Sequence, residues 1–183
     1  MKNFFGFIFI SLLILNVEGI SSEKLINSLQ EGEKLIFIRH AYAPGNGDPE
    51  NFDLKDCSTQ RNLSKIGIEQ SKKIGLFFKN NNIKIDKVLS SEWCRCKDTA
   101  RIAFKNFETY KALNSFYDEK FASNEKIQIN NLRNYIKKWN NDKNLVFVTH
   151  FVVISGILNK GTNSGEIIIS DKNFNIIGSI ETM

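Results

Sequence analysis

The chain has 183 residues, a length that suits one domain and is too short for two ordinary ones. It contains 25 basic and 20 acidic residues, which gives a net charge of +5. Hydrophobic residues make up 42% of the chain and charged residues 25%, and with only two prolines this composition excludes a largely disordered protein. The basic residues form no basic helix and no patch interleaved with aromatic residues, which argues against nucleic-acid binding.

The first residues are expected to form a secretory signal peptide over residues 1–19. After Lys2, an almost uninterrupted apolar run extends from Phe4 to Val17 and falls short of the about 20 residues that span a bilayer. Val17-Glu18-Gly19 then supplies small residues where a signal peptidase cleaves. We therefore expect residues 20–183 to be a single exported domain, periplasmic or secreted, with no stable membrane insertion after cleavage. An uncleaved anchor is the alternative.

After the leader, short apolar runs alternate with helical patterns. The unbroken runs are typical of strands buried on both faces, as in a parallel sheet covered by helices. Expected strands cover 35–38, 87–90 and 145–148, expected helices cover 63–80 (N-cap Ser64), 93–107 and 124–139, and a hairpin pairs 167–169 with 176–177 around Asp171-Lys172-Asn173. This alternation predicts an α/β fold, a three-layer sandwich with a mostly parallel central sheet.

The two histidines of the chain each follow one of these apolar runs after a single polar residue. The runs end as Ile38-Arg39-His40 and Val148-Thr149-His150. Ligands of open α/β sheets bind beyond the carboxyl ends of the strands. If the two strands are parallel neighbours, both imidazoles emerge at the same edge of the sheet. A lone histidine is more often structural, but this matched pair indicates a functional site.

Four ordered motifs resemble the histidine phosphatase (phosphoglycerate mutase-like) superfamily. They are Arg39-His40, the helix start from Leu63 to Gln70, the segment from Ser91 to Ala100, and Thr149-His150. The family's second motif runs Ser, three residues, Arg, three residues, Thr-Ala, which the segment from Ser91 to Ala100 matches in register with Arg95 as its arginine. The resemblance covers roughly residues 34–158 and implies a phosphoglycerate mutase-like fold.

The resemblance also implies a mechanism. His40 is the family's nucleophile and forms a phosphohistidine that water hydrolyses, which divides one difficult displacement into two easier ones. Arg39 and Arg95 stabilise charge on the phosphoryl oxygens with planar, permanently charged forks. His150 adds a hydrogen bond or a positive charge. Taken alone, each arginine would be read as half of a surface ion pair.

The segment that follows His40 carries two glycines, two prolines and an asparagine between residues 44 and 49, which indicates an ordered loop with unusual backbone angles. Asn46 lies where many family members carry a phosphate-contacting asparagine, so the resemblance implies phosphate binding there. The alternative role for Asn46 is that of a turn residue with positive φ. Arg61 is a further phosphate-binding candidate, and Arg61 and Tyr42 are the two residues that could reach the mouth of the pocket, with nothing in the sequence to decide between them.

The general acid is where the chain departs from the family. Many phosphatases of the superfamily carry Glu two residues past a Leu after the second helix, but here Leu113-Asn114-Ser115 places Ser at that position. The acid-phosphatase branch places Asp after the second histidine, where this chain has Phe151. Asp48, Asp118 and Glu119 are the nearby candidates, each otherwise read as a solvated loop charge. The alternative is a substrate whose leaving group needs little protonation, such as an aryl phosphate, an acyl phosphate or a phosphoramidate.

The three cysteines allow at most one internal disulfide in an exported protein. Cys94 and Cys96 flank Arg95, so a bridge from Cys57 to either would tie two loops together near the site, and three free thiols are the alternative. The spacing fits no zinc pattern, and we expect neither metal nor cofactor.

The expected function is therefore hydrolysis of small phosphate monoesters by an exported, metal-independent phosphatase through phosphohistidine on His40. The alternatives are a phosphohistidine phosphatase and a non-catalytic binder of phosphorylated envelope sugars. A mutase is disfavoured because the short chain lacks the segments for a second phosphate site. The physiological substrate and the oligomeric state cannot be read from the sequence.

Overall fold

The computed structural model describes residues 22–183, so the expected signal peptide, residues 1–19, lies outside the described residues. The described strands are β1 (Leu35–Arg39), β2 (Ile85–Ser90), β3 (Glu108–Thr109), β4 (Asn144–Thr149), β5 (Ile167–Ser170) and β6 (Ile176–Ile180). The helices are α1 (Ser22–Glu31), α2 (Lys65–Asn80), α3 (Cys94–Phe104), α4 (Glu119–Ala122), α5 (Glu125–Lys138) and α6 (Phe151–Leu158), with short 3-10 turns η1 (Cys57–Thr59) and η2 (Lys111–Leu113).

The six strands form one sheet in the order β3-β2-β4-β1-β5-β6. Strands β1 to β4 run parallel to one another where they pair, and β5 and β6 close the sheet as antiparallel strands. The predicted mostly parallel sheet and the closing hairpin are both confirmed. The register pairs Arg39 with Thr149, so the residues that follow, His40 and His150, leave the sheet at the same edge.

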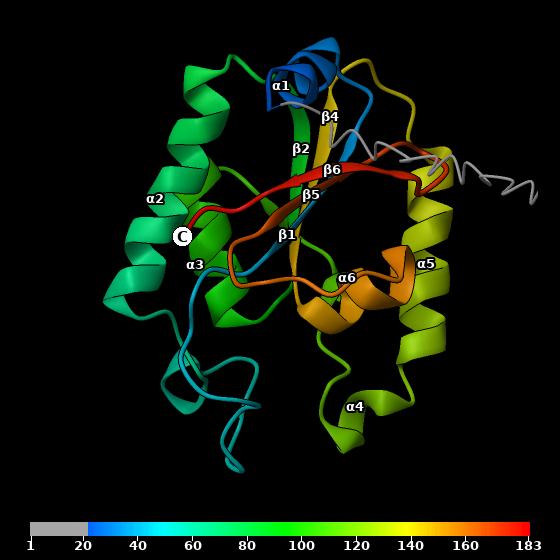
Figure 1. The fold of residues 1–183 in the computed structure, drawn as a ribbon. Coiled ribbons are helices and arrows are strands. Elements are labelled where there is room, and N and C mark those ends of the chain that lie inside the picture. The colour runs from blue at the N-terminus through cyan, green and yellow to red at the C-terminus, as the bar shows by residue number, and fades with distance from the viewer. Residues whose placement is uncertain (1–21) are drawn as a thin grey trace, which may run out of the picture.

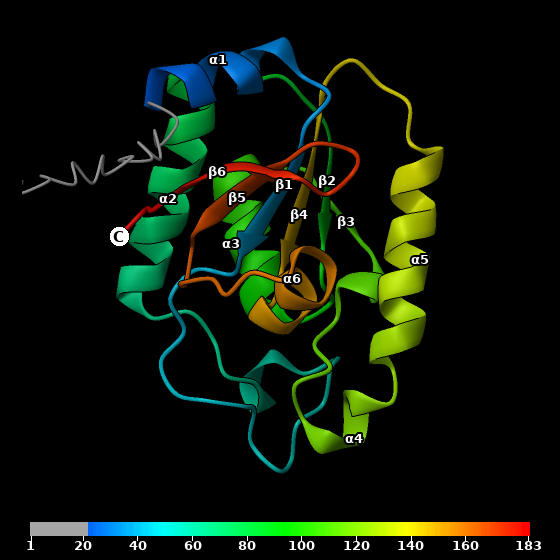
Figure 2. The ribbon, with the colours of Figure 1, turned by 45° about the vertical axis from the view of Figure 1, so that its right-hand side comes forward.

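Helices cover both faces of the sheet, which makes the predicted three layers (Figure 1). Alternate residues of each central strand enter two separate hydrophobic clusters: Ile36 and Ile38 of β1 pack with α1, α2 and α3, whereas Leu35 and Phe37 pack with α5, α6 and η2. Burial on both faces explains why these strands are apolar without alternation. Figure 2 shows the same layers after a rotation, with α4 and the loop between β1 and α2 at one end of the sheet.

The helix predicted over 63–80 forms as α2 and begins after Ser64, whose side chain accepts a hydrogen bond from the backbone N–H of Gly67. The predicted N-cap is therefore confirmed. The helices predicted over 93–107 and 124–139 form as α3 and α5 with shorter bounds. Helix α3 ends early because Lys105 adopts a positive φ of 66°, which terminates the helical backbone.

Sequence patterns missed several elements. Helix α6 has the sequence FVVISGIL and directly follows β4, so its apolar residues read as part of the same run. Helix α1 adjoins the expected leader, and β3 and α4 are too short to give a periodic signal. None of the helices within residues 22–183 is long and apolar enough to cross a membrane.

Candidate active site

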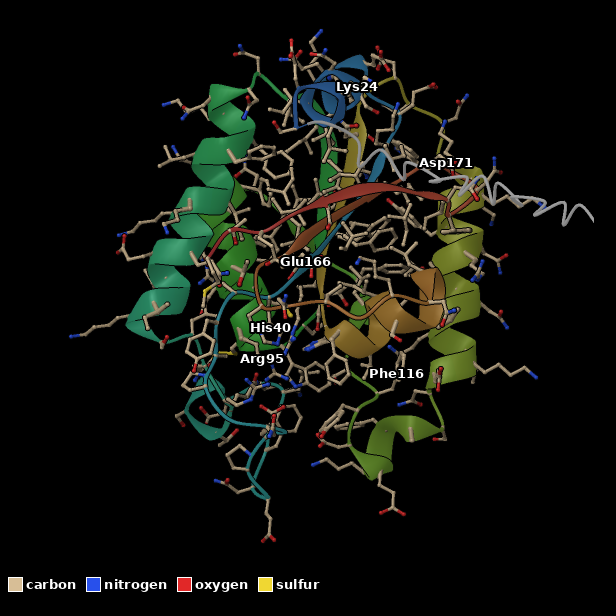
Figure 3. The ribbon with its side chains drawn as sticks, in the orientation of Figure 1. Lys24, His40, Arg95, Phe116, Glu166 and Asp171 are labelled. Carbon is tan, nitrogen blue, oxygen red and sulfur yellow. A yellow bond between two sulfur atoms is a disulfide. The ribbon has the colours of Figure 1, made fainter. Side chains whose placement is uncertain are left out.

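The site lies at the carboxyl ends of β1, β2 and β4. The backbone N–H of His40 donates to the carbonyl of Thr149 at 2.9 Å, and the two imidazole rings lie with their centroids 5.5 Å apart. Helix α3 begins just after β2 and delivers Arg95 beside His40, as Figure 3 shows. The expectation that both histidines emerge at one edge of the sheet is confirmed.

These residues surround a cavity of about 100 Å³. Its lining includes every residue proposed from the sequence except Glu119; the lining residues are Arg39, His40, Gly45, Asn46, Gly47, Asp48, Arg61, Arg95, Ser115, Tyr117, Asp118, His150 and Phe151. Three guanidinium groups face two carboxylates in this set, so the cavity is positively charged and suits an anion.

His40 is held in one tautomer. Its Nδ1 lies 2.9 Å from the carbonyl oxygen of Ala41, and because a carbonyl can only accept, Nδ1 carries the hydrogen and Nε2 carries the lone pair. Nε2 accepts a hydrogen bond from Nε of Arg95 at 3.2 Å. Burial, followed by the charge of Arg95, holds the pKa of His40 well below its usual value. The imidazole is therefore neutral at neutral pH, as a nucleophile must be.

His150 is also neutral in the absence of a ligand. Burial lowers its pKa well below the usual value, and the nearby charge of Arg95 lowers it further. Its Nε2 lies 2.9 Å from the hydroxyl of Ser91 and 3.5 Å from the sulfur of Cys96. Burial also raises the pKa of the Cys96 thiol to about 12, so that thiol stays protonated. Of the two roles expected for His150, hydrogen bonding to a phosphoryl group fits this state better than a permanent positive charge.

Arg95 is fixed by a buried carboxylate. Its Nη1 and Nη2 donate to the two oxygens of Asp48 at 2.8 Å and 3.1 Å, and both side chains are only 3% exposed. Asp48 also accepts hydrogen bonds from Nε1 of Trp93 and from the backbone N–H of Arg61, both at 3.0 Å. Nη1 also donates to the backbone carbonyl of Arg61 at 3.3 Å, and Nε donates to Nε2 of His40.

The interpretation of Asp48 as a solvated loop charge is therefore wrong. Burial by itself would raise its pKa, but the hydrogen bonds and charge of Arg95 outweigh that effect and leave the pKa below its usual value. A carboxyl group that stays ionised and has both oxygens occupied is poorly suited to donate a proton.

Arg39 and Arg61 add two further positive charges. Nη1 of Arg39 donates to the carbonyl of Thr162 at 2.7 Å, whereas its Nε is buried with no hydrogen-bond partner among the described residues. An unpartnered buried donor in the wall of a cavity calls for an acceptor from a ligand. The side chain of Arg61 donates to the carbonyls of Gly47 and Ala43, which fixes it against the loop. The alternative of a surface ion pair is therefore wrong for both predicted arginines: Arg39 forms no ion pair with the described residues, and the pair of Arg95 with Asp48 is buried.

The loop after His40 has the unusual backbone expected for it. Gly45 and Gly47 adopt positive φ angles of 91° and 61°. Asn46 between them lies outside the set of residues with positive φ, so its alternative role as a left-handed turn residue is wrong. Asn46 is exposed and lines the cavity, where its amide is free to meet a phosphate oxygen.

Helix α2 holds the start of this loop. The amide of Gln70 accepts from the backbone N–H of Tyr42 at 2.9 Å and donates to the carbonyl of Ser164 at 2.7 Å. A methyl group on Gly67 would lie 2.1 Å from the carbonyl oxygen of Tyr42. The motif from Leu63 to Gln70 thus reflects packing: Gly67 allows the close approach, and Gln70 joins the loop to the segment before β5.

The remaining acid candidates separate by position. Asp118 lines the cavity near Gly47, because its Oδ1 would lie 3.4 Å from a methyl group at that glycine. Glu119, the first residue of α4, is not among the lining residues. Ser115, at the position of the family's glutamate, is buried and its hydroxyl accepts from the backbone N–H of Tyr117 at 3.2 Å. Asp118 is therefore the carboxyl best placed to reach a leaving group.

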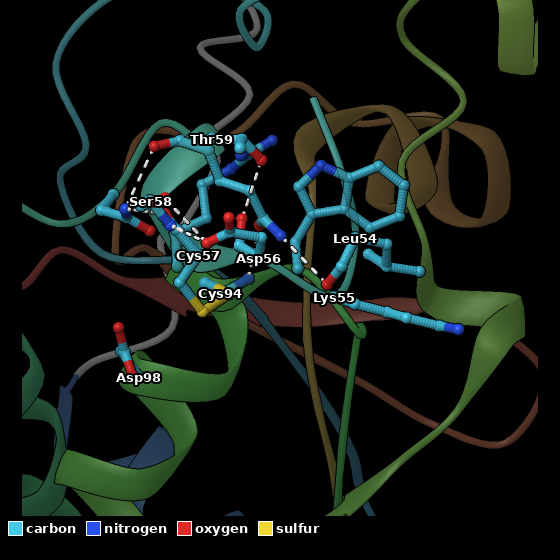
Figure 4. The surroundings of a disulfide bond; sticks show 12 residues. Leu54, Lys55, Asp56, Cys57, Ser58, Thr59, Cys94 and Asp98 are labelled. Atoms are coloured by element: carbon cyan, nitrogen blue, oxygen red, sulfur yellow. Dashed lines mark hydrogen bonds between the residues drawn. A yellow bond between two sulfur atoms is a disulfide. The ribbon is translucent and has the colours of Figure 1, made fainter. Parts of the chain in front are cut away.

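A disulfide closes the same region. Cys57 in η1 is bonded to Cys94, the first residue of α3 (Figure 4). Cys96 is a free, buried thiol. This pairing settles the alternatives left open by the sequence. The bond ties the segment that carries Arg61 to the helix that carries Arg95. Within residues 22–183 no group of three or more His, Cys, Asp or Glu side chains could hold a metal ion.

Sequence reasoning missed two features of the site. Tyr117 gives no motif signal and enters the cavity wall through an irregular segment. The pairing of Asp48 with Arg95 joins residues 47 positions apart, and the loop composition that marked Asp48 carried no information about its partner. The only sequence feature that pointed to this contact was an acidic residue in the loop rich in glycine and proline that follows Arg39-His40.

Comparison with known proteins confirms the resemblance drawn from the motifs. Residues 35–121 match the model of the histidine phosphatase superfamily (branch 1). No curated protein matches the chain in sequence.

Solved structures share the fold. The protein histidine phosphatase SixA complexed with tungstate has a TM-score of 0.61 at 14% identity, covering 81% of this chain and 97% of that chain. Phosphoserine phosphatase from Entamoeba histolytica, complexed with 3-phosphoglyceric acid, has a TM-score of 0.61 at 17% identity, covering 82% and 98%. Phosphoglycerate mutase from Thermus thermophilus has a TM-score of 0.58 at 13% identity, covering 81% and 98%. The chain therefore has a phosphoglycerate mutase-like fold.

Proposed function

We propose that this protein is a phosphatase that hydrolyses small phosphorylated compounds through a covalent phosphohistidine on His40. One observation carries the proposal: a neutral imidazole with its lone pair on Nε2 lies in a cavity of about 100 Å³ lined by three guanidinium groups. This cavity therefore combines the two requirements of phosphoryl transfer, a nucleophile and groups that stabilise the charge on the phosphoryl oxygens.

The first step transfers the phosphoryl group to His40. Incoming phosphate oxygens accept hydrogen bonds from the guanidinium groups, including Nε of Arg95, which releases the Nε2 lone pair. Nε2 then forms a bond to phosphorus while the bond to the leaving oxygen breaks, and that oxygen departs with the electron pair. The positive charge that develops on the imidazole is stabilised by Nδ1–H donating to the carbonyl of Ala41.

The second step returns the enzyme to its starting state. Water attacks phosphorus, the bond to Nε2 breaks, and the electron pair goes back to the ring. The products are a neutral imidazole and dihydrogen phosphate, so this step needs no net proton uptake. Only the leaving oxygen of the first step needs a proton, from solvent or from Asp118.

The test is hydrolysis of phenyl phosphate in the presence of a chelator, by the wild-type protein and by His40→Ala. We expect activity that survives chelation and falls by at least about a thousandfold in the variant, as expected when a nucleophile is lost. A matched surface variant, Lys126→Ala on α5, should keep full activity. Activity that is unchanged in His40→Ala would contradict the proposal, and phosphate binding without any hydrolysis would favour the non-catalytic binder.

A second candidate function, phosphohistidine phosphatase, is favoured by the position of Ser115. The family's glutamate is replaced there by a buried serine that supports the backbone, so no carboxyl fixed at that position can protonate a poor leaving group. Hydrolysis rates for a series of phosphate esters show whether a general acid takes part. A rate that falls steeply as the pKa of the leaving group rises indicates that the leaving group departs without being protonated. A flat series that becomes steep in Asp118→Asn would instead identify Asp118 as the general acid.

We also propose that the protein is exported, by cleavage of the signal peptide expected over residues 1–19. The disulfide between Cys57 and Cys94 supports this, because structural disulfides persist in oxidising compartments. The mass of the protein isolated from the producing cell tests the proposal. A chain that starts near residue 20 agrees with export, whereas a chain that retains Met1 and reduced cysteines does not.

A further inference from the structure

The cavity is too small to hold a whole substrate. Its volume of about 100 Å³ accommodates a phosphoryl group, whereas sites that enclose a complete ligand measure about 300–1,000 Å³. The group that carries the phosphate must therefore lie outside, against the residues that form the mouth. Specificity beyond the phosphoryl group depends on those residues.

The lining residues divide by exposure into a polar floor and an aromatic rim. His40, Arg95 and His150 on the floor are nearly inaccessible to solvent. Eight large hydrophobic side chains are exposed within residues 22–183, and two of them, Tyr117 at 52% and Phe151 at 37%, line the cavity. The other exposed lining residues are Gly45 and Asn46, neither of which carries a large apolar side chain.

The two aromatic rings are held in place. Tyr117 follows Phe116, which is buried in the cluster beneath α5 and α6, and its backbone N–H is bound by Ser115. Phe151 is the first residue of α6, and its ring lies 5.3 Å from the guanidinium carbon of Arg39. The rings of Tyr117 and Phe151 meet edge to face with centroids 5.5 Å apart. Exposed rings fixed by their neighbours lose little conformational entropy when they bind a ligand.

We propose that Tyr117 and Phe151 form an aromatic rim that selects phosphoryl groups carried by a planar aromatic ring, as in a phenolic ester or a phosphorylated imidazole. Such a ring would stack on one rim side chain and meet the edge of the other, while its phosphoryl group enters the floor. The inference rests on the proposed function for the phosphoryl site, but it concerns binding and does not require turnover. It also agrees with the absence of the family's glutamate, because aromatic leaving groups need less protonation.

Binding of phosphonates tests the proposal without hydrolysis, because their carbon–phosphorus bond is not cleaved. Dissociation constants of phenylphosphonate, cyclohexylphosphonate and methylphosphonate are measured by calorimetry on the wild-type protein and on Tyr117→Ala, Tyr117→Phe and Phe151→Leu. We expect phenylphosphonate to bind on the order of tenfold more tightly than methylphosphonate. That ratio should fall towards one in Tyr117→Ala and in Phe151→Leu and persist in Tyr117→Phe, which keeps the ring. Leu76→Ala on α2 removes an equally exposed side chain far from the rim and should keep the ratio.

The outcomes separate the two proposals. Equal binding of phenyl- and methylphosphonate, or a preference for phenylphosphonate that survives both rim variants, would overturn the aromatic rim. Equal binding of cyclohexyl- and phenylphosphonate would also overturn it, because the rim would then recognise any apolar ring, a sugar face included. Selective binding without hydrolysis of any phosphate would leave the rim standing and remove the phosphatase. Failure of all three phosphonates to bind would overturn the phosphoryl site, and the rim with it.

Discussion

The two histidines owe their neutral state to the same surroundings. Burial and the charge of Arg95 both disfavour a second proton on either ring. Nδ1–H of His40 is committed to the carbonyl of Ala41, so the reactive nitrogen is chosen by the backbone rather than by another side chain. Burial, reinforced by the charge of Arg95, thus keeps both rings neutral, and the carbonyl of Ala41 selects the tautomer of His40.

This arrangement predicts how stability depends on pH. The unfolded chain protonates its histidines near pH 6.5, whereas the folded chain does so only at lower pH, so the unfolded state binds more protons in between. The free energy of unfolding should therefore fall as pH drops below about 6.5, with a limiting slope of about 1.4 kcal/mol per pH unit for each histidine. His40 and His150 are the only histidines of the chain.

Urea unfolding between pH 7.5 and pH 5 measures that slope. The variant His150→Gln should show about half of it, because one of the two linked groups is removed. A stability that stays constant across this range in the wild-type protein would mean that the histidines take up protons at the same pH in the folded and unfolded states, and that burial does not lower their pKa.

We expect Asp48 to act as a positioning residue, because its carboxylate oxygens are occupied by Arg95, Trp93 and the backbone N–H of Arg61. In Asp48→Asn, Arg95 loses a charge-assisted bidentate partner worth about 1.5–3 kcal/mol, so kcat should fall roughly tenfold to a hundredfold. Inorganic phosphate should inhibit the variant more strongly, because a negative charge leaves the cavity wall. Steady-state kinetics with phosphate inhibition show both effects.

The control is Asp98→Asn, which removes a carboxylate paired with Arg101 on the exposed face of α3. It should change neither parameter. If kcat and phosphate inhibition fall together in Asp48→Asn, general loss of the fold is the explanation, and the positioning role is wrong.

At the scale of elements, the site depends on how α2 packs against the loop that follows β1. The start of that loop is joined to α2 at Tyr42, both by Gln70 and by the close approach of Gly67. The first two turns of the helix therefore fix the course of the chain just after the nucleophile, although none of their residues lines the cavity.

We expect Gly67→Ala to reduce both stability and activity. Alanine favours a helix by about 1 kcal/mol over glycine, but its methyl group would overlap the carbonyl oxygen of Tyr42 at 2.1 Å. Overpacking of this kind costs about 1–3 kcal/mol and shifts the backbone. Thermal unfolding and hydrolysis of phenyl phosphate measure the two losses.

Gly161→Ala is the matched control, since a methyl group there has nothing within 4 Å. It should leave both measurements unchanged. A Gly67→Ala protein that is more stable and fully active would show that the loop is not held by this contact.

At the scale of the whole molecule, the sequence predicted what depends on local pattern. The apolar runs of β1 and β4 made these buried strands recognisable from the sequence. Each strand is followed directly by a histidine, so the end of the strand also gave the position of that histidine. Their parallel pairing then brings His40 and His150 together. The helical motif placed Arg95 beside them because α3 begins directly after β2.

The rest depends on contacts between distant segments that carry no periodic signal. The bond between Arg95 and Asp48 arises because the loop after β1 folds back over α3, and composition cannot give that path. The same holds for the rim, where Tyr117 reaches the cavity through an irregular segment fixed by Phe116. Helix α6 was missed because an apolar helix that follows an apolar strand shows one continuous hydrophobic run.

The central claim, a phosphoryl group bound covalently to His40, is tested most directly by trapping the intermediate. The protein is mixed with phenyl phosphate, denatured in alkali within milliseconds and analysed by mass spectrometry of its peptides. We predict one phosphoryl group on the peptide that contains His40, stable in alkali, lost in acid and absent from His40→Ala. Phosphate on another residue, or steady hydrolysis with no phosphorylated peptide at any time, would contradict the mechanism.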